Sequence, residues 1–418
     1  MIDLERELSE LSRLRSTAEP VVSLYLDLRF TDERARDRVR DGVRAGARRA
    51  LDHTLPDAPG MDGLRRTLER VTAHVDGLTA ATAWPEAQGL ALFACGAIGL
   101  WRPLLVRLPL EDALEVDGFP HLLQLARLRD DFAPAIVVVA SAQGADLYEV
   151  SLGELAAEAS LRGEVPRSDG EKVNAGTGKP GRHYDREAKD ERRERSVIRR
   201  NLQAAAREAT VRFDRAPAAA VVLVGTAENV AAFERELPQR LKERVVARLA
   251  RPRAWVSDAG QQRTGVVENA TQAVTAHERG QETQLVEHLV GEALRGRLAV
   301  IGPADVVTAV NQRRVHRLVL HADLDGTGWE CGQCDAIGAN AETQEECPYC
   351  GGELRVLRNL AEALVIRTLA VGGDVEVVAP ERRLGSYRGV GAYLRQTAAT
   401  GLRGASQPWP TAPGASQP

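Results

Sequence analysis

Four cysteines near the C-terminal end constrain the fold of this chain more than any other feature. They form two pairs, Cys331-x-x-Cys334 and Cys347-x-x-Cys350, with twelve residues between the pairs. Each pair can present two thiolates from a tight turn, and the spacing lets the second turn fold back onto the first, which is typical of a closed four-cysteine zinc site. We therefore predict a ribbon over residues 327–352 that holds one structural zinc ion. A redox dithiol, or two unrelated loop pairs, are the alternatives that the spacing leaves open.

The composition limits the classes of protein to which the chain can belong. Its 418 residues are enough for two to four domains, and its 55 basic residues nearly balance 59 acidic ones. Contact with nucleic acid therefore has to come from local basic faces. The fifth cysteine, Cys95, ends the apolar run 90–95 and is predicted to be a buried thiol. Neither a signal peptide nor a run of eighteen apolar residues occurs, so we expect a soluble, cytoplasmic protein without a membrane partner.

Hydrophobic periodicity predicts α/β structure in three consecutive regions. In the first region, residues 1–128, apolar residues alternate along 21–28, which indicates a half-buried strand, and recur at helical spacing along 32–51. The elements expected in this region are helices beginning at residue 4 and covering 32–51 and 61–79, and strands at 21–28, 89–94 and 103–108.

The second region, residues 129–265, is expected to open with a strand at 135–140 and a hairpin that runs through residue 150. Its other expected elements are a charged helix at 185–209, a strand at 219–225, a helix at 228–248 and a strand near 254–256. Between the hairpin and the charged helix, residues 166–184 lack apolar periodicity and are predicted to form a long, exposed basic loop.

The third region, residues 266–400, is interrupted by the predicted ribbon. The elements expected around the ribbon are a long helix at 266–295, a helix ending at 311, strands at 317–320 and 375–378, and an amphipathic helix beginning near 357. The tail, 401–418, repeats Gly-Ala-Ser-Gln-Pro and is predicted to be disordered.

The order of these parts resembles a known family. The segments that carry the resemblance are Ser23-Leu24-Tyr25-Leu26, the strand 89–93, the glycine-bearing loop that enters a basic helix, residues 311–320, the inserted ribbon and residues 389–394. Together they resemble the archaeal and eukaryotic class-1 peptide chain release factor superfamily, which includes Pelota, bacterial relatives and the ribosome hibernation factor Balon. The resemblance covers nearly the whole chain.

This resemblance implies an α/β, three-domain, release-factor-like architecture. An N-terminal domain, 1–128, would reach the decoding centre, and an RNase-H-like middle domain, 129–265, would enter the peptidyl transferase centre. A C-terminal domain, 266–400, would engage the ribosome and partner proteins, with the ribbon as the minidomain found in archaeal members. The implied partner is the ribosome through its RNA. P-site tRNA and a translational GTPase stay open as partners, and we expect a monomer.

Two motifs of the family are missing from this chain. Release factors hydrolyse peptidyl-tRNA with a Gly-Gly-Gln tripeptide in the middle-domain loop, whereas residues 174–183 here read Asn-Ala-Gly-Thr-Gly-Lys-Pro-Gly-Arg-His. Since the glutamine helps to place the attacking water, its loss argues against peptide release. The Asn-Ile-Lys-Ser element that reads stop codons is also absent. We therefore expect no codon-specific termination, no enzyme activity and no catalytic residue.

The loop and helix over residues 179–200 are the candidate RNA contact. They hold nine basic residues against five acidic ones. Exposed glycines and arginines can follow a phosphate backbone, although a solvated helix with charge pairs one turn apart is the alternative. Gly176-Thr177-Gly178-Lys179 is not a P-loop, because Val173 and Pro180 occupy the positions that need Gly and Ser or Thr. The candidate RNA-binding residues are Gly176, Gly178, Lys179, Arg182, His183, Arg186, Lys189 and Arg193.

These observations predict a translation protein that binds the ribosome and occupies the A site without hydrolysing peptidyl-tRNA, in ribosome hibernation or ribosome rescue. The alternative is a codon-independent peptidyl-tRNA hydrolase that acts on stalled ribosomes and orders water through His183. A third class, an RNA-binding or protein-interaction module that never enters the ribosome, also stays open.

Overall fold

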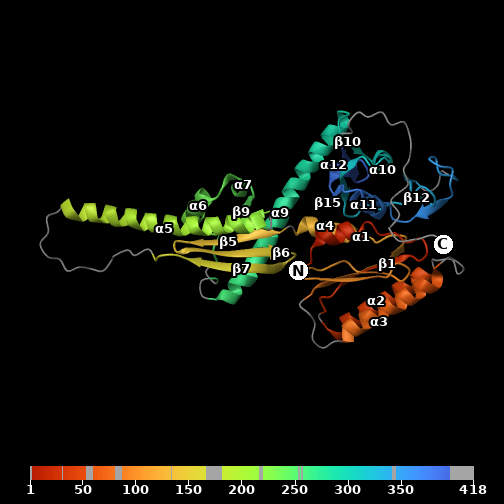
Figure 1. The fold of residues 1–418 in the computed structure, drawn as a ribbon, viewed down its shortest axis with the longest axis horizontal. Helices are drawn as coiled ribbons and strands as arrows, with labels where there is room; N and C mark the ends of the chain where they lie inside the picture. Colours follow the sequence, from red (N-terminus) through yellow and green to blue (C-terminus); the bar gives the residue numbers. More distant parts are fainter. Residues whose placement is uncertain are drawn as a thin grey trace, which may run out of the picture. The chain divides into compact units, whose positions relative to one another are not determined.

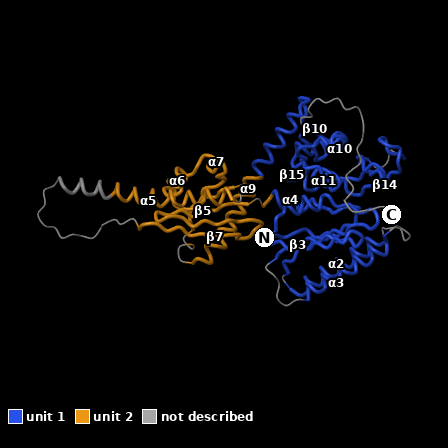
Figure 2. The backbone as a smooth tube through the Cα atoms, in the orientation of Figure 1, with its two compact units in different colours: residues 1–130, 279–418 blue, residues 131–278 orange. Residues whose placement is uncertain are grey.

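The computed structural model describes ten parts of the chain: residues 2–30, 32–52, 60–80, 87–132, 134–165, 181–215, 220–252, 255, 258–340 and 345–395, with side chains from residue 191 onward in the sixth. The chain divides into two compact units, Met1–Asp130 with Arg279–Pro418, and Asp131–Glu278 (Figure 2). Among the described helices, none combines the length and the apolar composition that a bilayer span requires.

The N-terminal part of the first unit is a four-stranded antiparallel sheet, ordered β3-β2-β1-β4, with helices α2 and α3 on one face (Figure 1). Its elements are α1 (Leu4–Leu11), β1 (Val21–Asp27), α2 (Glu33–Asp52), α3 (Met61–Ala80), β2 (Gly89–Cys95), β3 (Leu100–Val106), β4 (Ala113–Asp117) and α4 (Leu123–Asp131). The predicted helices and strands of this region are confirmed, and Cys95 is buried as expected. Strand β4 and helix α4 were not predicted.

The expectation that β1 is only half buried is wrong. Leu24 and Leu26 pack against α2 and α3 as predicted. The other face is covered as well, because Tyr25 is 2% exposed and its hydroxyl donates to the carbonyl of His121 at 2.6 Å. The segment around His121 therefore closes a face of the sheet that alternation alone assigned to solvent.

The second unit is a five-stranded sheet between two layers of helix. Its elements are β5 (Ala135–Ser141), β6 (Gly144–Ser151), β7 (Glu154–Arg162), α5 (Gly181–Arg215), β8 (Ala220–Gly225), α6 (Ala227–Glu236), α7 (Gln239–Lys242), β9 (Val245–Ala250) and the first part of α9 (Ala259–Leu294). The strand order is β7-β6-β5-β8-β9, with β8 and β9 parallel to β5. Helices α5, α6 and α7 pack on one face, and α9 packs on the other.

Two predictions in this unit are wrong. The helix expected over 228–248 ends at Glu236, before Pro238, and residues 245–250 form strand β9 at the edge of the sheet. Proline removes a backbone donor, and the Val245-Val246 pair favours a strand. Trp255 is helical rather than in a strand, and it is buried beside α9; Ala254 and Val256 lie outside the described residues. Helix α5 begins at Gly181, four residues earlier than predicted.

The C-terminal part of the first unit is a second sheet, ordered β10-β16-β11-β15, with the small ribbon sheet β13-β12-β14 beside it. Its elements are the last part of α9, then β10 (Ala299–Ile301), α10 (Pro303–Asn311), β11 (Val315–His321), β12 (Gly328–Cys331), β13 (Ile337–Ala339), β14 (Leu354–Leu357), α11 (Leu360–Ala370), β15 (Asp374–Val378), α12 (Arg382–Gly385) and β16 (Val390–Leu394). The predicted strands at 317–320 and 375–378 and the helix ending at 311 are confirmed. The long helix begins at Ala259, seven residues earlier than predicted, and the helix expected from near 357 begins at Leu360 and is buried along 360–368 rather than amphipathic. The predicted disordered tail, 401–418, lies outside the described residues. The division into three domains at residues 128 and 265 stays a prediction.

A buried carboxylate joins the two parts of the first unit. Glu362 on α11 is 5% exposed, and its oxygens accept the backbone N–H groups of Leu122 at 2.6 Å and Leu123 at 3.0 Å, where α4 begins. A negative charge at a helix N-terminus satisfies N–H groups that have no partner within the helix. Burial raises the pKa of Glu362. Burial alone would lower the pKa of neighbouring His121, but the carboxylates of Asp117 and Glu362 outweigh this effect, so that the pKa of His121 is raised.

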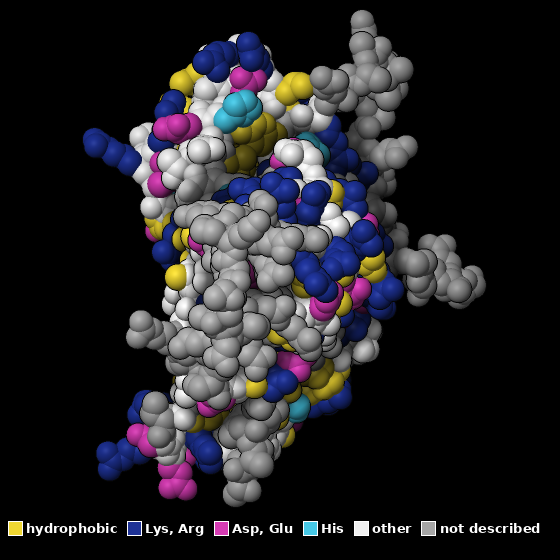
Figure 3. All heavy atoms as spheres, turned by 90° about the vertical axis from the view of Figure 1, so that its left-hand side faces the viewer, with side chains coloured by type: hydrophobic (Ala, Val, Ile, Leu, Met, Phe, Trp, Pro, Cys, Tyr) yellow, Lys and Arg dark blue, Asp and Glu magenta, His cyan; other side chains and the backbone are white. Residues whose placement is uncertain are grey.

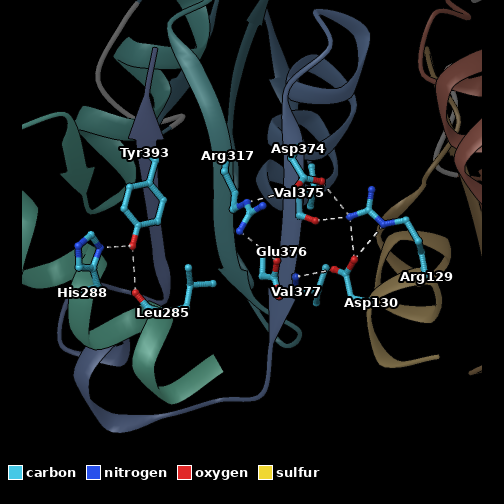
Figure 4. Close-up of polar contacts among 10 residues, drawn as sticks. All are labelled: Arg129, Asp130, Leu285, His288, Arg317, Asp374, Val375, Glu376, Val377 and Tyr393. Carbon is cyan, nitrogen blue, oxygen red and sulfur yellow. Dashed lines mark hydrogen bonds and ion pairs between the residues drawn. The ribbon is translucent and has the colours of Figure 1, made fainter. Parts of the chain in front are cut away.

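The other end of α4 binds the edge strand β15, as Figure 4 shows. Arg129 donates to the carbonyl of Val375 at 2.5 Å, and the carboxylate of Asp130 accepts the N–H of Val377 at 3.0 Å. An edge strand presents unpaired backbone groups, and these two side chains satisfy two of them. Burial raises the pKa of Asp130 to about 7, against a smaller opposite effect of the Arg129 guanidinium.

This contact makes the stability of the first unit depend on pH. Because the folded chain holds the Asp130 proton more tightly than the unfolded chain, the contribution of this group is full below the usual aspartate pKa and is lost as pH rises through about 7. From pH 6 to pH 8 we expect the free energy of unfolding of the wild type to fall by about 1.4 kcal/mol more than that of Asp130→Asn. Urea titrations at the two pH values measure this difference.

The matched control is Asp41→Asn, because the side chain of Asp41 is 78% exposed. We expect this variant to follow the wild type at both pH values. Parallel pH curves for the wild type and Asp130→Asn would show that this carboxyl does not titrate in the range.

Candidate metal centre and nucleic-acid interface

The ribbon brings the four predicted cysteines together. The sulfur atoms of Cys331 and Cys350 lie 3.5 Å apart, those of Cys334 and Cys347 lie 3.6 Å apart, and all four lie within 4.8 Å of one another. Each pair sits in a turn next to a ribbon strand, and Gly351 takes the left-handed conformation that the second turn needs, with φ at 72°. The predicted pairing of the two turns is confirmed.

These distances fit a tetrahedral metal ion. With metal–sulfur bonds of about 2.3 Å, the edges of the tetrahedron are about 3.8 Å long. The N–H groups of Gln333 and Cys334 point at the sulfur of Cys331, at 3.4 and 3.5 Å. Burial raises the pKa of Cys331, but these hydrogen bonds and those of Cys350 and Cys334 outweigh it and lower the pKa, whereas burial raises the pKa of Cys334. The four cysteines can therefore hold a metal ion.

Trp329 and Gly338 form the packed side of this site. One cluster of buried side chains in the ribbon contains Trp329, Cys331, Ala336 and Cys347. A Cβ atom on Gly338 would lie 2.1 Å from the Trp329 ring, so only glycine leaves room for the indole. The ring covers the cysteine cluster, and its place depends on this glycine.

Replacing Gly338 with alanine is therefore expected to displace Trp329 and to lower the free energy of unfolding by about 1–3 kcal/mol, the usual cost of overpacking a core. Urea unfolding followed by tryptophan fluorescence measures the change. Gly332→Ala is the control within the same ribbon, since its Cβ would have only ordinary contacts, the nearest at 3.5 Å. Equal stability of the two variants would contradict the packing argument.

Two side chains outside the ribbon fix it to the rest of the first unit. Asn311, at the end of α10, donates to the carbonyl of Ile337 at 2.8 Å and accepts its N–H at 3.0 Å. Arg367 on α11 is 3% exposed; it binds the carboxylate of Glu330 and donates to the carbonyl of Asp335 at 3.2 Å. The position of the metal site thus depends on α10 and α11.

Helix α5 carries the candidate RNA contact. Its N-terminal part extends past the ends of the strands in Figure 1, and the first buried side chain along the described part of the helix is Val197. Arg192 and Arg193 are exposed, and neither has an ion-pair partner among the described side chains. In contrast, Arg199 pairs with Glu236 at 3.1 Å. Figure 3 shows Lys and Arg side chains interspersed with Asp and Glu side chains on the face that it presents.

The predicted RNA-binding residues fall into three groups. Gly176, Gly178 and Lys179 lie outside the described residues. Four further residues, Arg182, His183, Arg186 and Lys189, lie on the backbone of α5 before the first described side chain of that helix. Arg193 is exposed on the same helix. The loop predicted over 166–184 ends before Gly181, and its residues 166–180 are also outside the described ranges.

A cleft in the N-terminal region was not predicted. It has a volume of about 810 Å³ and is lined in part by Glu19, Gly60, Arg66 and Arg70. Glu19 is 5% exposed at its base, and its carboxylate accepts the Thr67 hydroxyl at 2.6 Å and two N–H groups at 2.9–3.0 Å. Arg66 and Arg70 are exposed on α3 and line this cleft together with Asp62. No local pattern in the sequence marks Glu19, since its partners are distant in the chain.

Comparisons with known proteins give one family match and several matches to solved structures. Residues 120–274 match the family model "Bacterial archaeo-eukaryotic release factor family 10". No curated protein matches the sequence. An archaeal translation termination factor is 17% identical over 94% of this chain and 97% of its own, with a TM-score of 0.24. Pelota from Archaeoglobus fulgidus is 13% identical over 75% and 80%, with a TM-score of 0.33.

A translation termination-like factor from S. cerevisiae, involved in RNA quality control pathways, is 11% identical over 72% of this chain and 75% of its own, with a TM-score of 0.36. These identities and TM-scores are low, so the similarity to release factors rests on the match over residues 120–274. That match includes the sheet of the second unit and helix α5. Residues 120–274 are therefore similar to a bacterial archaeo-eukaryotic release factor family.

Proposed function

We propose that this protein binds the ribosome and occupies the A site without hydrolysing peptidyl-tRNA, in hibernation or rescue. One observation carries the proposal. Residues 120–274, which match a release-factor family, include helix α5 and the residues before it, but their sequence contains no Gly-Gly-Gln. The part of the chain that would reach a ribosomal active centre is retained, whereas the group that would place water there is missing.

The proposed mechanism is steric. The N-terminal region would fill the decoding region, with the arginines at the rim of its cleft facing ribosomal RNA. The loop around Lys179 and Arg182 would extend toward the peptidyl transferase centre, and Arg192 and Arg193 would contact phosphates. Arginine suits this role because its planar fork donates two hydrogen bonds to one phosphate. Such a plug needs no catalytic residue.

We further propose that the metal is zinc and that its role is structural. Four thiolates around one ion leave no open position for substrate, and thiolate ligands favour zinc among the common divalent ions. The zinc-bearing region would dock on the ribosome or on a translational GTPase, and P-site tRNA would lie next to the middle loop. A cytoplasmic monomer is the form that this role requires.

Co-sedimentation with intact ribosomes near physiological salt tests the proposal. We expect the protein to pellet with ribosomes whose A site is empty and to stay in the supernatant when a tRNA fills the A site. Pelleting that A-site tRNA does not change would place the binding site elsewhere. Absence of pelleting in both cases would leave only the shared family fold and would contradict ribosome binding.

A peptide-release assay on the same complexes separates a plug from a hydrolase. We expect no release above that of ribosomes alone, for the wild type and for His183→Ala equally. Release by the wild type that His183→Ala abolishes would show that His183 replaces the missing glutamine and that the chain is an enzyme.

A further inference from the structure

Asn201 is a buried polar residue on α5. It lies one turn after Val197, where the helix changes from exposed to buried, and it is 7% exposed. Its side-chain amide donates to the carbonyl of Ala142 at 3.1 Å and to that of Glu164 at 2.8 Å. Both hydrogens of the buried amide nitrogen therefore have backbone partners.

The two carbonyls belong to different pieces of chain. Ala142 is in the turn between β5 and β6, and Glu164 is two residues beyond the end of β7. The N–H of Gly163 donates to the carbonyl of Gln143 at 2.7 Å, which holds these two pieces side by side. Asn201 thus ties the turn, the exit from β7 and helix α5 together. Strand β7 and helix α5 are consecutive elements of the chain, and the Asn201 side chain links the residues after β7 to α5.

Gly163 leaves room for the side chain of Asn201 because it has no Cβ atom. A Cβ atom on Gly163 would lie 2.0 Å from the side-chain oxygen of Asn201 and 2.5 Å from its carbonyl carbon, so a larger residue there would push the amide away. The neighbouring ion pair of Arg200 with Glu164, at 3.3 Å, is too exposed to fix the helix, with 65% and 63% of the two side chains accessible. The buried amide and the glycine are the specific part of this contact.

Asn201 lies at the base of the long N-terminal part of α5. The helix from Gly181 to Asn201 rises about 1.5 Å per residue and is therefore about 30 Å long. Arg193 lies eight residues before Asn201, about 12 Å along the helix, so a change of about 10° at Asn201 would move it by about 2 Å. Contacts between arginines and phosphates depend on distances near 3 Å, so an error of that size separates them.

We propose that Asn201 and Gly163 form a lock that sets the direction in which the basic end of α5 leaves the sheet, and that ribosome binding requires this direction. The inference rests on the proposed ribosome contact and names its positioning residues. Asn201 does not touch RNA in this scheme. It acts through Arg192 and Arg193, so its loss should weaken binding to a fixed RNA surface and leave binding to a flexible RNA unchanged.

Three variants test the lock: Asn201→Ala, Gly163→Ala and the double variant. We expect each single change to weaken ribosome binding by about three- to fivefold, the order of one lost phosphate contact, and to change the affinity for a 20-nucleotide poly-U by less than about twofold. The double variant should bind no more weakly than Asn201→Ala alone, because the shortened side chain makes room for the new Cβ atom. Equal losses on ribosome and poly-U, or additive effects, would overturn the proposal.

A distance measurement tests the lock without the ribosome. Spin labels on unnatural amino acids at positions 193 and 228 report the direction of α5 relative to α6, since both positions are exposed. We expect one narrow distance distribution in the wild type and a broader or shifted one in Asn201→Ala. An unchanged distribution would overturn the lock, even if the wild type binds the ribosome. A changed distribution in a protein that does not bind would refute the proposed function and leave the lock standing.

Discussion

Removing the metal is expected to unfold the ribbon and to destabilise the whole first unit. The cluster around the cysteines has only four buried side chains, which is too small a core to fold alone, so the metal-binding free energy, about 10–16 kcal/mol in small zinc peptides, is the folding free energy of the ribbon. Unfolding the ribbon also takes Glu330 and Asp335 away from Arg367. A buried guanidinium without partners costs about 3–5 kcal/mol in the core formed by α11.

We expect about one equivalent of zinc in the purified wild type, almost none in Cys347→Ser, and a loss of unfolding free energy in that variant of about 3–5 kcal/mol or more. Metal analysis and urea unfolding followed by circular dichroism measure both quantities. The control is Cys95→Ala, since Cys95 is also buried but lies outside the cluster. It should keep its zinc. Less than about half an equivalent in fresh wild type, or full stability in Cys347→Ser, would refute the metal site.

The sequence predicts those elements whose evidence is local. The spacing of the four cysteines is local, and so are the apolar runs that became β5 and β8 and the stripe of α2. The prediction of one helix over 228–248 is wrong because the apolar residues of strand β9 also fit the spacing of a helix. Pro238 was the overlooked sign of a break, and pairing with β8 decided the conformation of Val245–Ala250.

The contacts that assemble the first unit have no local signature. Glu362 binds the backbone of Leu122, 240 residues away, and Asp130 binds that of Val377, 247 residues away. A glutamate inside the apolar helix α11 was the one available sign, because a buried carboxylate needs partners. Its partner cannot be named from sequence, since it is a pair of backbone N–H groups.

The candidate site divides in the same way. The cysteines and the basic composition of α5 could be read directly, whereas the residues that position them could not. Arg367 and Asn311 hold the ribbon, and Asn201 holds α5, each through backbone carbonyls on distant strands or turns. An isolated amide or arginine within a helix gives no information on a partner of this kind. Positioning residues therefore emerge only once the tertiary structure is known.

Replacing Arg192 and Arg193 with alanine is expected to weaken ribosome binding by about 10- to 30-fold near 0.15 M salt. Each phosphate contact releases counterions and contributes about 0.7–0.9 to the slope of log K against log salt, so two contacts contribute about 1.4–1.8. These two arginines are chosen because they are exposed and have no ion-pair partner among the described side chains. Binding measured from 0.05 to 0.3 M salt gives both the affinity and the slope.

The control for this prediction lies on the same helix. Arg207 and Arg215 are exposed on the part of α5 that packs on the sheet, and the described residues offer them no ion-pair partner either. Replacing both with alanine removes the same net charge and the same side chains. If the long-range field of the protein alone drew it to RNA, the two double variants would lose equal affinity and equal slope. A loss confined to Arg192 and Arg193 requires direct contact at the projecting end of α5, which is the arrangement that the A-site plug predicts.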